Sequence, residues 1–147
     1  MRGNPAGNNG APSDDAPAPR PDALSVLQAT LDALQKNGDP DAAARAVVPH
    51  LHKSQLDGTG ANLSNDVRQF SFKKAHTNAG NYESPVRVTR TRASSSPTIG
   101  SGAAAENGQS VDYFIAKRNG DKGMPAPVTI FFPASGGPPK VAYLGSM

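Results

Sequence analysis

The segment from Pro127 to Ser146, PVTIFFPASGGPPKVAYLGS, constrains the fold more than any other part of this chain. Two runs rich in β-branched and aromatic residues flank a turn of Gly and Pro, which is the pattern of a β-hairpin. A strand with one face in water alternates apolar with polar residues, and neither of these runs does so. The sequence therefore predicts a sheet that is apolar on both faces and needs a cover on each.

Two further segments complete a set of four predicted strands: VRVTRTR after Pro85, and SVDYFIAKR from Ser110 to Arg118. Residues two apart in a strand share a face. One predicted face carries alternate residues of the last three strands: Val111, Tyr113, Ile115, Val128, Ile130, Phe132, Val141 and Tyr143. The opposite face carries Phe114, Ala116, Phe131, Ala142 and Leu144. The low-complexity segment 94–109 is predicted to be a long loop, and Asn119-Gly120 a turn.

Helices are predicted before the strands. From Asp22 to Lys36, leucines three or four residues apart form one helical face, with Asp22 as the N-cap and Asn37-Gly38 as the stop. A second helix begins after Asp39 with Pro40 at its first position, and Pro49 must break it. Helices followed by strands in hairpins predict an α+β fold with a mostly antiparallel, four-stranded sheet.

Segment 64–76 fits two patterns. Ser64 or Asn65 could cap a helix that buries Val67 and Phe70, or Phe70 and Phe72 could alternate as in a strand. We favour the helix because the residues Asn78 to Asn81 would end it.

Residues 1–21 contain no Val, Ile, Leu or aromatic residue, so they are predicted to be a disordered tail ahead of one domain at 22–147. No run approaches the about 20 apolar residues of a membrane span, and the start lacks the apolar core of a signal peptide. The Pro/Ala/Gly/Asn spacer resembles the tether that follows the lipid-bearing cysteine of bacterial lipoproteins. We expect an exported, periplasmic domain with a lipid tether upstream of Met1, with a cytoplasmic protein as the alternative.

The order of elements and the closing hairpin VTIFFPASGGPPKVAYLGS resemble the NTF2-like superfamily, the cystatin-like α+β cone, over residues 22–146. The resemblance implies a curved sheet around a long helix with a conical pocket, and dimerisation through the outer sheet face. It also implies, for the enzymes of the family, an Asp-His pair inside the cone. No position here matches that pair, and the fold alone does not choose between enzyme and binding domain.

Charge and cysteine content exclude several classes of site. The chain has no cysteine, which excludes disulfides, thiol catalysis and cysteine metal sites. Its net charge is +3, and between Asp66 and Arg92 six basic residues face two acidic ones. Nucleic-acid-binding domains are usually more basic over their whole length and richer in aromatic residues, so nucleic acid is not the expected partner.

Catalytic candidates are few. His50 and His52 are two residues apart, so on a helix their side chains point in different directions. A zinc site needs at least a third ligand, and His76 is the only other histidine. We therefore expect no metal site and no cofactor. Asp112 or His76 could act as a base and Tyr113 as a donor if they faced a pocket. No phosphate loop and no GxSxG elbow occurs.

Three arginines of the first predicted strand, Arg87, Arg90 and Arg92, could form an anion-binding patch with Lys73 and Lys74. The alternative is an edge strand kept soluble by its charge. Strict alternation would place Arg90 and Arg92 on the apolar side, so either a bulge resets the strand or the strand leaves the core near Thr89.

The expected function is a non-catalytic binding or assembly module, a homodimer or partner of another protein, with Phe114, Phe131 and Leu144 in the interface. Two alternatives remain open: a small-molecule carrier or isomerase-like enzyme that uses the cone pocket, and a module that binds an acidic partner through Arg87–Arg92.

Overall fold

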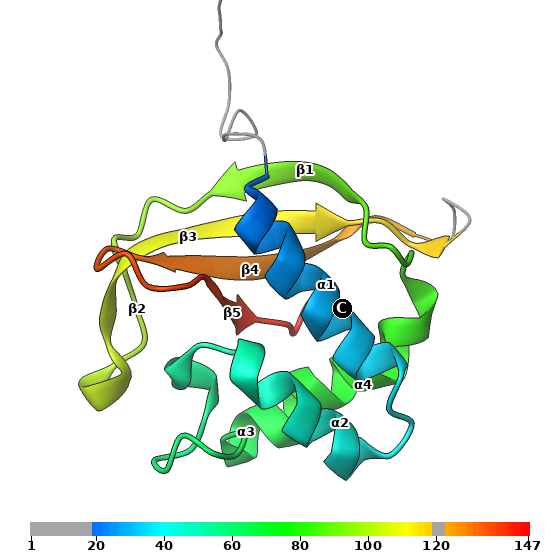
Figure 1. The fold of residues 1–147 in the computed structure, drawn as a ribbon, viewed down its shortest axis with the longest axis horizontal. Coiled ribbons are helices and arrows are strands. Elements are labelled where there is room, and N and C mark those ends of the chain that lie inside the picture. Colours follow the sequence, from blue (N-terminus) through cyan, green and yellow to red (C-terminus); the bar gives the residue numbers. More distant parts are fainter. Residues whose placement is uncertain (1–18, 119–122) are drawn as a thin grey trace, which may run out of the picture.

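A computed structural model describes residues 19–118 and 123–147 of this chain, and its fold is α+β, as predicted. Helix α1 (Pro21–Gln35) crosses one face of an antiparallel sheet diagonally, and the later helices lie beyond one edge of the sheet (Figure 1). Most of the predicted tail, residues 1–18, and the predicted Asn119-Gly120 turn lie outside the described residues. In the parts described, no helix has the length and apolar character to cross a membrane.

The first two helices follow the capping chemistry of the sequence with one difference. Helix α1 (Pro21–Gln35) begins two residues earlier than predicted: Arg20 and not Asp22 is its N-cap, and Asp22 lies in its first turn, where its carboxylate accepts from the Arg20 guanidinium. Pro21 causes this shift because its fixed φ suits the first helical position. Helix α2 (Pro40–Val47) has the predicted cap, since the Asp39 side chain accepts from the backbone N–H of Ala42. Its α-helical part ends before Pro49, as expected.

Short helical segments connect α2 to the next long helix. The segments are η2 (Val48–His50) and η3 (Lys53–Gln55). A continuous helix then runs over residues 65–78, which we call the 65–78 helix, and the predicted helix at 64–76 is confirmed. It consists of α3 (Asn65–Val67), the π-helical segment η4 (Arg68–Phe72) and α4 (Lys73–Asn78), and η5 (Ala79–Asn81) follows it.

The sheet of the described residues has five strands, one more than predicted. Strands β1 (Val88–Ala93), β3 (Glu106–Ile115), β4 (Ala126–Pro133) and β5 (Lys140–Tyr143) lie in the order β1-β3-β4-β5. The additional strand β2 (Thr98–Ile99) pairs with the start of β3. The prediction of a long loop at 94–109 was therefore wrong in part, because η6 (Gly102–Ala104) turns the chain back and lets β3 begin at Glu106.

The core lies between α1 and the inner face of the sheet. Val111, Tyr113 and Ile115 belong to it, as the alternation predicted. Leu27, Leu31 and Leu34 of α1 are buried against this face, and burial of each such side chain contributes about 1.5–3 kcal/mol. The packing of this leucine stripe on the sheet therefore stabilises the fold.

Strand β5 departs from simple alternation, which corrects the prediction for its end. Thr129 pairs with Tyr143 whereas Ile130 pairs with Val141, so Ala142 is an extra residue in β5. Such a bulge reverses the faces of the residues that follow it. Tyr143 therefore lies on the outer face with Thr129, and Leu144 turns into the core instead of joining Phe114 and Phe131.

Side chains of the same chain cover the outer face of the sheet. Phe131 is fully buried beneath the ring of His52, with 5.0 Å between ring centroids. Phe114 is 6% exposed because the guanidinium of Arg90 lies 3.7 Å from its ring centroid and that of Arg92 lies at 5.0 Å. The second cover that the sequence required is thus present within one chain.

Candidate functional site

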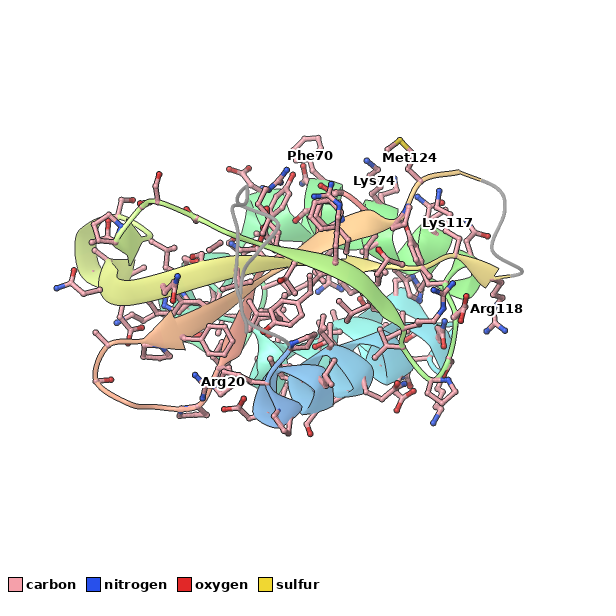
Figure 2. All side chains as sticks on the ribbon, turned by 90° about the horizontal axis from the view of Figure 1, so that it is seen from above. Arg20, Phe70, Lys74, Lys117, Arg118 and Met124 are labelled. Atoms are coloured by element: carbon pink, nitrogen blue, oxygen red, sulfur yellow. The ribbon has the colours of Figure 1, made fainter. Side chains whose placement is uncertain are left out.

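An open groove runs between the 65–78 helix and the end of strand β5. Its volume is about 670 Å³, and its apolar lining includes Val67, Phe70 and Tyr143. Phe70 is 68% exposed and Tyr143 is 48% exposed. Among the described large apolar side chains, only Met124 is comparably exposed, so two of the three such side chains line one groove. Phe70 points away from α1, toward the opposite side of the molecule (Figure 2).

The exposure of Phe70 corrects the prediction that it is buried, and the π-helical segment explains the difference. The apolar side chains that face the core are Val67, then Phe72, then Ala75. The step of five residues from Val67 to Phe72 suits a π turn, whose hydrogen bonds span five residues, and not an α turn. Phe72 consequently takes the buried position, and Phe70 is turned out to solvent.

Several contacts fix the 65–78 helix at both ends. The Ser64 hydroxyl accepts from the backbone N–H of Val67, and Arg68 forms an ion pair with Asp41 of α2. At the other end, His76 Nε2 donates to the carbonyl oxygen of Asn37 at 2.7 Å, and Asn78 donates to that of Met147 at 3.1 Å. The groove therefore has a rigid wall, as a preformed binding surface requires.

Charged side chains of both signs line the groove. Asp66 lines one end, and Lys73 and Lys74 line the other. All three are exposed, and none forms an ion pair with another residue in the described ranges. Their charges are thus available to a partner.

The opposite wall depends on Gly145. A Cβ atom at this position would meet the hydroxyl and ring carbons of Tyr143, so the ring of Tyr143 can fold back over the chain only because residue 145 is glycine. This close approach sets the direction in which Tyr143 faces the groove.

The interior between α1 and the sheet has little free space. The cavity lined by Leu31, Ile115, Leu144 and their neighbours measures about 10 Å³. That is about the volume a single water molecule needs, so this space does not hold a small-molecule ligand. The interior is a packed core at this point and not the pocket that the resemblance implied.

The structure separates the three catalytic candidates. Asp112 lies on the outer face, where it accepts from Arg92 at 2.8 Å and from the Thr129 hydroxyl at 2.7 Å. Tyr113 lies on the opposite face in the core, where burial raises the pKa of its phenol. His76 lies on the 65–78 helix and stacks on Phe72 with 5.7 Å between ring centroids. The candidates therefore do not share a pocket.

The two other histidines also point apart. His52 is buried, and its ring is held at both nitrogens: the backbone N–H of Ser54 donates to Nδ1, and Nε2 lies 2.8 Å from the Glu106 carboxylate. His50 lies in η2, where burial and the nearby charge of Lys140 lower its pKa. Within the described residues, no three potential ligands gather into a metal-binding group.

The predicted basic patch is divided between two edges of the sheet. Strand β1, with Arg90 and Arg92, is one edge strand, whereas Lys73 and Lys74 line the groove beside β5, the other edge strand. Arg87 lies before β1 and pairs with Glu83 at 2.9 Å. The pairing of β1 with β3 shifts register between Val88 and Arg90, in agreement with the first of the two alternatives, a bulge that resets the strand.

Sequence reasoning missed Phe70, the more exposed of the two aromatic residues that line the groove. Phe70 was assigned to the core by α-helical spacing, and Asp66 and Tyr143 were not considered as partner-binding residues. The step of five between Val67 and Phe72 was the available signal, because a helix that buries both must contain a π turn. No signal in the sequence indicated that the bulge at Ala142 would expose Tyr143.

Comparison with known proteins adds no relationship. No family model matches the chain, and neither the search of curated proteins nor that of solved structures found a significant match.

Proposed function

We propose that the protein is a non-catalytic binding or assembly module, an NTF2-like α+β cone by fold, that binds a protein partner through the groove between the 65–78 helix and β5. The observation that carries this proposal is the exposed Phe70, which lines an open, largely apolar groove. Exposing an aromatic side chain to water is unfavourable for the isolated chain. A helix that contains a π turn is also uncommon, and such turns are frequently found at functional sites.

The shape of the groove favours a protein segment over a small molecule. Small-molecule sites enclose most of their ligand, whereas this groove is open, and charged as well as apolar side chains line it. Protein interfaces usually combine apolar and charged side chains. The helix arrangement on an antiparallel sheet is compatible with the cone fold, whose members include many binding domains.

A photo-crosslinking amino acid placed at position 70 tests this proposal in the cells that make the protein. We expect covalent adducts from position 70 and none from position 45, because Arg45 is exposed on α2 and lies outside the groove. Adducts that form equally at both positions, or at neither, would contradict the proposal. As the folding control, both variants should be obtained in the same yield as the wild type and should give the same circular dichroism spectrum.

A further inference from the structure

Three residues of the groove are spaced evenly along the 65–78 helix. Phe70 lies four residues after Asp66 and four residues before Lys74, and all three line the groove. One α turn and one π turn together take about eight residues, so the π segment brings Asp66 and Lys74 onto one face of the helix. Phe70 and Lys74 project on the same side of the molecule (Figure 2).

This spacing makes the surface complementary to itself. In a two-fold symmetric dimer, the same surface of each chain contacts the other. That surface must therefore contain both the side chain that inserts and the hollow that receives it. It must also carry charges of both signs. Here Phe70 protrudes beside a hollow of about 670 Å³. When two copies of the helix pack antiparallel about an axis beside Phe70, Asp66 of each copy meets Lys74 of the other.

We propose that the occupant of the groove is a second copy of this chain, packed with its 65–78 helix antiparallel to the first. This inference rests on the proposed function and names its partner. At the centre of the interface, the two Phe70 rings are removed from water together. An Asp66–Lys74 pair between the two chains lies at each end, and these pairs fix the direction of packing. Within one chain, Asp66 and Lys74 are about 12 Å apart along the helix. Lys73 adds positive charge at the same end of the groove as Lys74.

Sedimentation velocity of the purified full chain over a concentration series up to about 1 mM tests the proposal, since small interfaces are weak. We expect a concentration-dependent dimer. Phe70→Ser should abolish it, and Asp66→Lys or Lys74→Asp should each raise its dissociation constant by about tenfold or more, because each change replaces two attractive pairs with two repulsive ones. Arg45→Glu, a charge reversal of the same size on exposed α2, should leave the dimer unchanged.

A mixture of the two charge variants gives the decisive measurement. Asp66→Lys and Lys74→Asp chains should associate with each other about as tightly as wild-type chains do, because both ends of the mixed pair again join opposite charges. A mixture as weak as either variant alone would overturn the antiparallel arrangement. A chain that stays monomeric at every concentration, or a Phe70→Ser chain that dimerises like the wild type, would overturn the second copy as occupant.

These outcomes separate this inference from the proposed function. If the purified chain is monomeric while a photo-crosslinker at position 70 forms adducts with another protein in cells, the groove still binds a partner and only the second copy is excluded. If position 70 forms no adduct, the proposed function itself fails.

Discussion

His52 Nε2 lies 2.8 Å from Glu106 Oε1 and joins the segment after η2 to the first residue of β3, 54 positions later in the chain. The His52 side chain is 3% exposed and its ring covers Phe131. One hydrogen-bonded pair thus positions the loop that closes the outer face of the sheet.

Loss of this pair should destabilise the fold. We expect Glu106→Ala to lower the free energy of unfolding by about 1–2 kcal/mol, because it leaves the N–H of a buried imidazole without an acceptor. Glu83→Ala is the matched control, since Glu83 pairs with Arg87 in solvent, and it should cause no measurable change. Urea unfolding measures both, and equal effects of the two substitutions would contradict the role of the His52–Glu106 pair.

Phe70 and Phe72 should respond in opposite ways to truncation. Phe72→Ala is expected to cost about 3–5 kcal/mol of stability, because Phe72 is 2% exposed and its loss leaves a cavity. Phe70→Ala should change the stability of the monomer by less than about 0.5 kcal/mol, as exposed positions do. Thermal unfolding at a concentration too low for association separates the two, and a large loss from Phe70→Ala would show that Phe70 belongs to the core.

The π turn should tolerate the deletion of one residue. Removing Ser71 places Val67 and Phe72 four positions apart, so an ordinary α-helix can bury both. We expect a folded protein with stability at or above that of the wild type. Asp66 and Lys74 are then seven positions apart, which is about two α turns, so they still share a face and the association proposed for the groove should persist.

Deletion of Ala29 from α1 is the control for this change. It rotates Leu31 and Leu34 by about 100° relative to Leu27, so it should cost more than about 3 kcal/mol. Calorimetry and sedimentation measure both deletions. A Ser71 deletion as damaging as the Ala29 deletion would mean that the π turn is required for folding.

Two buried tyrosines should make stability fall at alkaline pH. Burial raises the pKa of Tyr82 and of Tyr113, and the Tyr82 hydroxyl donates to the carbonyl oxygen of Met147 at 3.1 Å. Above about pH 10 the unfolded chain loses these protons while the folded chain retains them, so the free energy of unfolding decreases as pH rises.

Below that pH both states are protonated, and the two tyrosines contribute no pH dependence. Urea unfolding between pH 8 and pH 11 checks this. The paired Tyr82→Phe and Tyr113→Phe substitutions should flatten the decline, and a decline that persists undiminished would assign it to other groups.

Much of this fold follows from local rules. The leucine spacing of α1, the Asp39 cap and the alternation of Val111, Tyr113 and Ile115 each depend on neighbours within a few residues, and each was predicted. Phe70 was misplaced because a π turn and an α turn have the same composition and differ only in which residue reaches the core.

The remaining errors concern contacts between distant segments. Leu144 was assigned to the outer face because the bulge at Ala142 depends on its pairing with β4. The His52–Glu106 pair also joins segments too far apart in sequence for spacing to indicate it. The groove combines both kinds of error, which explains why the sequence did not reveal it.

The placement of α1 on the sheet has a consequence for synthesis of the chain. The ribosome makes the leucine face of α1 before any strand, yet that face packs on Ile115, Val128 and Leu144, and Leu144 follows Leu34 of α1 by 110 residues. Until those residues leave the exit tunnel, the nascent helix has no sheet to cover it. Folding of this domain is therefore delayed until Leu144 has been made, and the leucine face of α1 stays uncovered for longer than that of a helix that packs on its nearest neighbours.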